Sequence, residues 1–288
     1  MTTAQHEATR TTTKPVVVGV MGKQSSVLTF AMQEAAETHS PLTVMHSTGL
    51  AMQAGDLYAD REVLGELRAH GRTLLDEVKE FVQHEAPDLQ AEYVLTAVPP
   101  MQALEDASRG ARALIVGSDH VPWFDRLLLS EVAGRLARHT DCPVVVVPEL
   151  NSAHTHDGSI ILPLDGDTVA DGAIRFAFEH AAAHHTAVRV LHVIAPRTLA
   201  DEAEAIKADV EKVIAGWRTT YPDIPVETSF SIGEPEPAII RSTSGARLVV
   251  VARPRSHRAL AASGSLATQV LRGAHCPVAV VPVDYAGA

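Results

Sequence analysis

Short apolar runs alternate along this chain with stretches whose apolar residues recur every three or four positions. Five runs in the first half are rich in β-branched residues and predict strands: 15–20, 42–46, 91–96, 112–117 and 143–147. Between the first two runs the apolar residues fall at i, i+3, i+4 and i+7: Leu28, Ala31, Met32 and Ala35. This spacing is typical of an amphipathic helix that buries one face.

Two longer apolar stripes predict further helices that pack on a core through one face. The first stripe contains six residues: Leu64, Leu67, Leu74, Leu75, Val78 and Val82. The second contains five: Ile206, Val210, Val213, Ile214 and Trp217. Strands that alternate with helices form right-handed βαβ units, so the pattern predicts parallel sheets with helices on both faces.

The second half of the chain repeats the first. GARALIVG at 110–117 returns as GARLVVVA at 245–252, and CPVVVVP at 142–148 returns as CPVAVVP at 276–282. A period this long indicates a duplicated domain, not an array of short repeats. The expected divisions are a disordered tail at 1–13, a first domain at 14–150, a linker at 151–158 and a second domain at 159–285.

Composition excludes several classes of protein. The 288 residues suffice for two domains with cores of their own. A net charge of −11 argues against binding to nucleic acid or to anionic membranes. Two cysteines cannot form a disulfide framework, and neither a signal peptide nor a membrane-spanning run is recognisable. These observations predict a cytoplasmic protein.

The order of the motifs resembles that of the universal stress proteins, and the chain is similar to the tandem form common in actinobacteria. The segments that carry the resemblance are VLHV, GEPEPAII, GARLVVVA, SGSLATQVL and the two CPVxVVP strands. The resemblance covers nearly everything from Lys14 to Val283. The resemblance implies an α/β fold of two tandem doubly wound domains, each a five-stranded parallel sheet of order 3-2-1-4-5.

In this family the last strand forms the edge of the sheet, and two such edges pair antiparallel across a two-fold axis. The resemblance therefore implies an internal pseudo-dimer, which would hide two apolar edges. If Val145 and Ala279 lie near the axis, residues whose numbers add up to about 424 stand opposite one another. A homodimer of the whole chain is a further possibility.

The same resemblance implies a nucleotide site in the second domain, at the carboxyl ends of the strands. Family members that bind ATP carry an Asp after strand one and a Gly-Ser or Gly-Thr pair before the helix that follows strand four. Asp165 matches the first position, and Gly264 and Ser265 match the pair, where free N–H groups of a helix would meet phosphate. Val193 takes the position that usually borders the adenine.

The loop after the fourth strand departs from the family pattern. Ala252 and Arg255 stand where two glycines are usual. Arg253 and Arg255 could replace main-chain contacts by holding phosphates through their side chains, or they could belong to a solvated basic loop. ATP with Mg²⁺ is the candidate ligand of this domain.

The first domain departs from the pattern almost everywhere. Met21 takes the Asp position, Gly117 keeps the first glycine, and His120 replaces the second. Ser130 and Glu131 replace the Gly-Ser pair, which would set a carboxylate where phosphate oxygens lie. At an effective dielectric of about 20, a like-charge contact near 4 Å costs roughly 4 kcal/mol. No nucleotide is expected in this domain.

These observations predict a non-catalytic stress-response protein whose second domain senses a nucleotide. The alternatives are an interaction scaffold that works through surfaces such as VPWFDRLLL with an unknown protein partner, and a slow ATP-hydrolysing enzyme. No catalytic residues and no metal site are predicted. His180 and His184, at i and i+4, are interpreted as an ordinary helix end.

Overall fold

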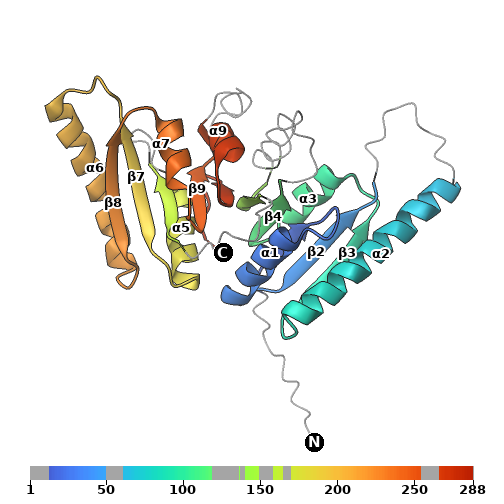
Figure 1. Cartoon of the computed structure of the whole chain (residues 1–288). Coiled ribbons are helices and arrows are strands. Elements are labelled where there is room, and N and C mark those ends of the chain that lie inside the picture. Colours follow the sequence, from blue (N-terminus) through green and yellow to red (C-terminus); the bar gives the residue numbers. More distant parts are fainter. Residues whose placement is uncertain are drawn as a thin grey trace, which may run out of the picture.

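One continuous ten-stranded sheet passes through both halves of the molecule (Figure 1). The structure, a computed structural model, describes seven parts of the chain: residues 13–49, 61–118, 136, 140–148, 158–164, 170–253 and 266–287. Most of the predicted tail and most of the predicted linker therefore lie outside the described residues, and the domain boundaries remain predictions.

Each half has the predicted βα alternation. The elements of the first half are β1 (Val16–Gly19), α1 (Ser25–Glu37), β2 (Leu42–Ser47), α2 (Arg61–Glu85), β3 (Ala91–Thr96), α3 (Pro100–Ser108), β4 (Ala113–Gly117) and β5 (Val144–Val147). Those of the second half are β6 (Ile160–Pro163), α5 (Asp171–Ala183), β7 (Val188–Ile194), α6 (Ala200–Thr220), β8 (Val226–Ile232), α7 (Pro235–Ser242), β9 (Leu248–Ala252), α9 (Leu266–Gly273) and β10 (Val278–Val281).

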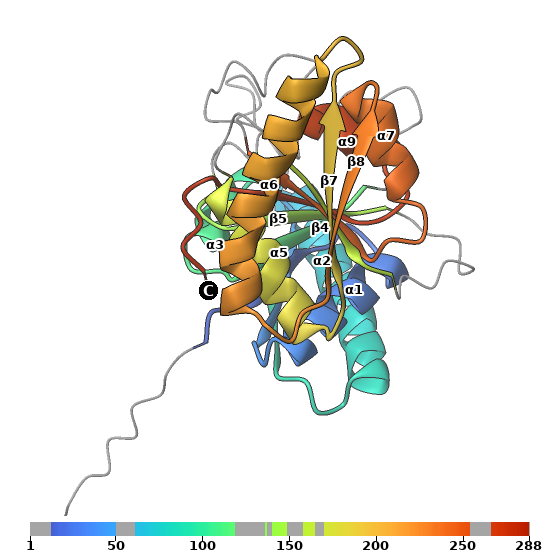
Figure 2. The same ribbon diagram turned by 90° about the vertical axis from the view of Figure 1, so that its left-hand side faces the viewer.

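The strand order confirms the predicted topology. The sheet runs β3-β2-β1-β4-β5-β10-β9-β6-β7-β8, which is 3-2-1-4-5 in the first half and the mirrored sequence of the same order in the second. All pairs within each half are parallel. Figure 2 shows α6 and α7 on either side of β7 and β8, as expected for a doubly wound sheet.

β5 and β10 join the two halves, and we call this antiparallel pair the seam. Val145 lies opposite Ala279, and Val146 lies opposite Val278. These pairs add up to 424, so the predicted register is confirmed. Every residue of both strands is buried. The seam therefore removes two apolar edges from solvent, which is the benefit expected of an internal pseudo-dimer.

A hydrophobic core on one face of the sheet is continuous across the seam. It includes residues from α1 and α2 of the first half and from α5 and α6 of the second, together with Val145 and Ala279. The opposite face carries two separate clusters, one in each half. The helices of the first face thus bind the halves together as well as covering their own strands.

Most residues of the predicted helix faces are buried or half-buried, but two are exposed: Leu64 of α2 and Val213 of α6, the latter by 40%. Leu74, Leu75, Val78 and Val82 of α2 are buried, but Leu64 of the same stripe is 38% exposed. α2 has 25 residues and β3 has six. At about 1.5 Å per helical residue and 3.3 Å per strand residue, the helix is nearly twice as long as the strand. Its N-terminal turns therefore extend past the sheet (Figure 1).

The beginning and the end of the described chain meet beside the seam. Lys14 and Gly287 line one polar cavity of about 240 Å³, together with Asp141 and Cys142 at the start of β5. Within the described residues, no helix combines the length and the apolar character needed to cross a membrane.

Candidate functional site

A cavity of about 380 Å³ opens at the carboxyl ends of β6 and β7. The strands contribute Pro163, Leu164, Leu191, His192, Val193 and Ile194. The surrounding helices and loops contribute Ala195, Thr198, Ile206, Asp209, Pro235, Ile239 and Leu266. In a doubly wound sheet this is the edge at which ligands bind, and the volume is within the usual range for small-molecule sites.

Local sequence explains why the walls of the cavity come together here. β6 and β7 are parallel neighbours, with Pro163 beside Leu191, so both strands end at the same edge. Pro235 begins α7 after Gly233, whose φ of 149° is a backbone conformation that favours glycine. A proline in the first turn loses no helical hydrogen bond, so α7 begins sharply beside the strand ends.

His192 is the polar group best fixed in this mainly apolar cavity. Its Nδ1 lies 2.7 Å from the carbonyl oxygen of Leu164, and the ring is buried. A carbonyl can only accept, so Nδ1 carries the proton and Nε2 of the neutral ring is left as an acceptor. His46 makes the same contact with the Val20 carbonyl in the first domain, at 2.8 Å. The duplicated histidine therefore ties the ends of the first two strands together in each domain.

The described residues bring only part of the predicted site to this cavity. Val193 lines it, as expected for the position that borders the base. Asp165, Arg255, Gly264 and Ser265 lie outside the described residues, as does the VPWFDRLLL segment. The described neighbours of the motif residues do line the cavity. Leu164 directly precedes Asp165, and Leu266, the first residue of α9, directly follows Ser265.

Arg253 lies at the seam, away from this cavity. Its Nη1 donates to the carbonyl oxygen of Thr140 at 2.9 Å, and its Nη2 is 3.9 Å from Asp284. It also lines the polar cavity beside Lys14. β9 is the neighbour of β10, so the residue that follows β9 faces the first domain across the seam.

Sequence reasoning missed His192, Asp209 and Thr198 as residues of the cavity wall. The only available signal was the histidine that both copies carry in their second strand, in LTVMHS and VRVLHV. Asp209 and Thr198 gave no signal, because each belongs to a polar stretch typical of a solvated surface.

The corresponding edge of the first domain is shaped differently. A Cβ placed on Gly117 would lie 2.6 Å from Nε2 of Gln24 and 3.0 Å from a methyl group of Val27. The Gln24 side chain thus covers the backbone at the end of β4, and its Oε1 accepts from the Met21 N–H at 3.4 Å. The equivalent of Gln24 in the second domain, before α5, is Ala170. His120, Ser130 and Glu131 lie outside the described residues.

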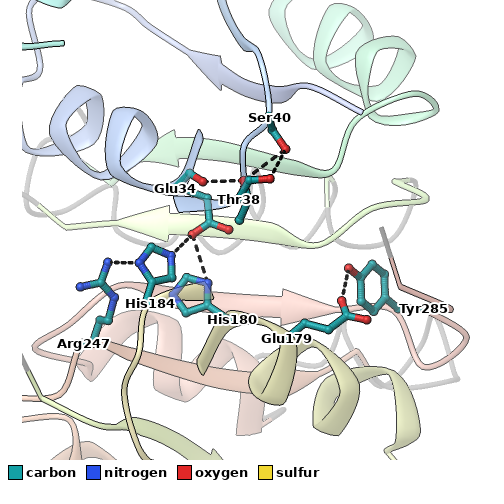
Figure 3. A network of polar contacts seen from close by, with 8 residues as sticks. All are labelled: Glu34, Thr38, Ser40, Glu179, His180, His184, Arg247 and Tyr285. Atoms are coloured by element: carbon teal, nitrogen blue, oxygen red, sulfur yellow. Dashed lines mark hydrogen bonds and ion pairs between the residues drawn. The ribbon is translucent and has the colours of Figure 1, made fainter. Parts of the chain in front are cut away.

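A second polar cluster lies between the domains, on the face with the continuous core (Figure 3). Glu34 of α1 approaches both histidines that the sequence places at i and i+4 on α5. Its Oε2 is 2.8 Å from Nε2 of His184 and 3.1 Å from Nδ1 of His180. All three side chains are almost fully buried. The histidine pair is therefore more than the ordinary helix end predicted from its spacing.

Both cysteines behave as core residues. Cys142 and Cys276 are buried and free, and burial raises the pKa of each thiol to about 12. A thiol that ionises so weakly is a poor nucleophile at neutral pH.

Comparisons with known proteins agree with this architecture. The model of the family described as "Universal stress protein family" matches residues 12–148 and 158–282. The universal stress protein Rv2623 of Mycobacterium tuberculosis is 25% identical over 284 residues, which cover 92% of this chain and 95% of the relative. A universal stress protein of Mycolicibacterium smegmatis is 26% identical over 285 residues, covering 92% and 96%. A crystal structure of a universal stress protein from Archaeoglobus fulgidus matches with a TM-score of 0.71 at 18% identity, covering 93% of this chain and 95% of that one.

Proposed function

Because this chain belongs to the universal stress protein family, we propose that it acts in the stress response as a nucleotide sensor whose second domain binds ATP with Mg²⁺. The observation that carries this proposal is the cavity of about 380 Å³ at the carboxyl ends of β6 and β7. Its position agrees with the switch-point rule for doubly wound sheets, and its volume is suitable for a small ligand.

The cavity offers separate surroundings for base and phosphates. Leu191, Val193 and Ile239 provide apolar surface for a purine ring. Nε2 of His192 can accept a hydrogen bond from an exocyclic amine. Through these groups the domain would orient the adenine base of the nucleotide.

The phosphates would lie near the N-terminus of α9. Leu266, the first residue of that helix, lines the cavity, so the two residues that precede it in the chain, Gly264 and Ser265, are our candidates for the phosphate contacts. Free N–H groups and the helix dipole attract anions there. We assign Asp165, which follows Leu164, to the ribose and Arg255 to the phosphates. Arg253 has partners at the seam, so it is the weakest member of the predicted set.

Calorimetric titration with ATP and Mg²⁺ tests the proposal. Val193→Tyr should fill the cavity and abolish binding. Ser47→Tyr is the matched control, because Ser47 ends β2 at the position equivalent to Val193, 146 residues earlier. Gly264→Glu should also abolish binding, by placing a carboxylate against phosphate. Losing one charge-assisted contact costs about 1.5–3 kcal/mol, or roughly ten- to a hundredfold in affinity.

Two outcomes would contradict the proposal. Absence of heat at millimolar ATP with the wild-type chain would favour the scaffold alternative. Strong new binding by Glu131→Ser would show that the first domain is open to nucleotide and that the assignment to the second domain is wrong.

A further inference from the structure

The polar cluster between the domains lies on the pseudo-two-fold axis of the molecule. α1 and α5 occupy equivalent positions 146 residues apart, and both are followed by a histidine with positive φ, His39 and His185. With this offset, Glu34 and His180 are equivalent residues. In a symmetric dimer of identical domains such a position would face itself. Duplication has instead allowed an acid and a base to face one another across the axis.

Hydrogen bonding fixes the proton positions in this cluster. Nη2 of Arg247 lies 2.6 Å from Nδ1 of His184. A guanidinium can only donate, so Nδ1 of His184 accepts and the ring proton is on Nε2. That proton points to Oε2 of Glu34, 2.8 Å away (Figure 3). Neutral His184 thus connects a partly buried cation of the second domain to a buried anion of the first.

The same geometry argues against a metal ion at these three residues. Glu34, His180 and His184 bring their ligand atoms within 4.8 Å of one another. Coordination would require the lone pair of Nε2 of His184, and that atom carries a proton as long as Arg247 donates to Nδ1. A guanidinium in contact with a ligand would also repel a cation.

Burial and two of its charged neighbours favour the neutral ring of His184, and Glu34 opposes them. Burial would raise the pKa of Glu34, but interactions with His180 and His184 outweigh it and hold that pKa well below its usual range. Burial lowers the pKa of His184, and the neighbouring His180 and Arg247 act in the same direction against Glu34. Glu37 on α1 and Tyr285 after β10 are the other titratable groups nearby.

We propose that Glu34, His184 and Arg247 form a pH-dependent latch that holds the two domains together at neutral pH and weakens in acid. Protonation of His184 would put a hydrogen on Nδ1, against Arg247. The contact would change from a hydrogen bond to a repulsion between two cations at a partly buried position. Nδ1 of His180 faces the same carboxylate oxygen, but neither of its buried ring nitrogens has a well-formed hydrogen bond.

The sign of the pH effect follows from the lowered pKa of His184. An open state exposes the imidazole, which then titrates near its ordinary value of 6.5. The latch is at full strength above that pH and weakens as pH falls below it. Between pH 7.5 and 5.5 the open state takes up at most about one more proton than the latched state. Its population relative to the latched state should therefore rise, by at most about tenfold. Glu34 contributes only below its ordinary value of 4.5, outside this range.

Hydrogen exchange of the full chain tests the latch. Amides of β5 and β10 should exchange faster at pH 5.5 than at pH 7.5, by up to about tenfold after correction for intrinsic rates, while amides of β2 and β7 should not. His184→Gln is the informative variant, because its amide can accept from Arg247 and donate to Glu34 without titrating. It should keep the seam protected at pH 7.5 and remove most of the acid effect. His185→Asn, at an exposed neighbour, is the matched control and should behave as wild type.

Three results would overturn the proposal. One is a seam whose exchange does not change with pH in the wild type. Another is an equal acid effect in His184→Gln and wild type. The third is stabilisation by Zn²⁺ that is lost in Glu34→Gln, because it would show that Nε2 of His184 is free to bind metal. If His184→Gln does not fold, the nitrogen chemical shifts of His184 in the wild type decide: a protonated Nδ1 at pH 7.5 contradicts the latch.

Discussion

Replacing Val145 by Asp tests whether the seam carries the association of the two halves. Val145 is 1% exposed and lies opposite Ala279, which is fully buried. Loss of the valine from the core costs about 1.5–3 kcal/mol. A buried polar group without a partner adds about 1–3 kcal/mol. The apolar neighbours of residue 145 cannot hydrogen-bond to the new carboxyl group. Both the lost apolar burial and the unpaired polar group therefore destabilise the state in which β5 and β10 are paired.

The charge adds a term that depends on pH. A carboxyl group held neutral at pH 7 against an ordinary pKa of 3.9 costs about 4 kcal/mol, at 1.36 kcal/mol per unit. The total of roughly 7–10 kcal/mol is comparable to the whole stability of a typical domain. The seam should therefore open before the carboxylate is buried. Two exposed apolar edges would then favour self-association.

Val145→Asn is the matched control, because it has nearly the same shape and polarity without the titration. Burial raises the pKa of the new Asp above its unfolded value, so the Asp variant should gain stability as pH falls. The difference between the two variants should shrink from about 4 kcal/mol at pH 7 to about 1.5 kcal/mol at pH 5. Comparing them at each pH also cancels the titration of His184.

Urea unfolding and size-exclusion chromatography measure the two consequences. The urea midpoint reports stability, and the elution volume reports self-association. A monomeric Val145→Asp variant with the wild-type midpoint would refute the pairing of β5 with β10. Equal midpoints for the Asp and Asn variants at pH 7 would show that residue 145 is hydrated.

Two further predictions concern the fold. Gly172→Ala should destabilise the chain by about 1–3 kcal/mol, since the new Cβ would lie 2.2 Å from the carbonyl oxygen of Pro282. Gly216→Ala should stabilise the chain by about 0.5–1 kcal/mol, because a Cβ at that position meets nothing within 4 Å. Thermal melting that ranks the two variants in the opposite order would contradict this packing. Cys142 and Cys276 should not form an intramolecular disulfide under mild oxidation. The register sets them at opposite ends of the seam, roughly 20 Å apart at about 3.4 Å per residue. A bridged peptide in mass spectrometry would disprove the register.

The sequence predicted most accurately what depends on local repetition. Each CPVxVVP segment is an apolar run bounded by prolines, so both strands and their pairing could be inferred, and the register followed once Val145 was placed near the axis. The buried faces of α1 and of most of α2 followed from helical spacing for the same reason.

What could not be predicted depends on contacts between distant residues. Glu34 shows no partner in its own stretch of sequence, because its partners come from the other domain 146 and 150 residues later. Arg253 looked like a phosphate ligand because of its loop, and its contacts with Thr140 and Asp284 require the seam to be known first. The N-terminal end of α2 is exposed because the helix is longer than the neighbouring strand β3. The spacing of apolar residues along the helix contains no information about the length of that strand.

The shared cavity beside Lys14 and Gly287 has a consequence for the connectivity of the chain. The two ends of the described fold meet at one place, and the sheet is symmetric about the seam. A circular permutant, in which these two ends are linked and the chain is cut between the domains, would keep the same ten strands with the same neighbours in the sheet. Circular permutation is tolerated where termini lie close together at a surface. The fold therefore requires one copy of each domain but does not require that the domain for which we propose nucleotide binding come second.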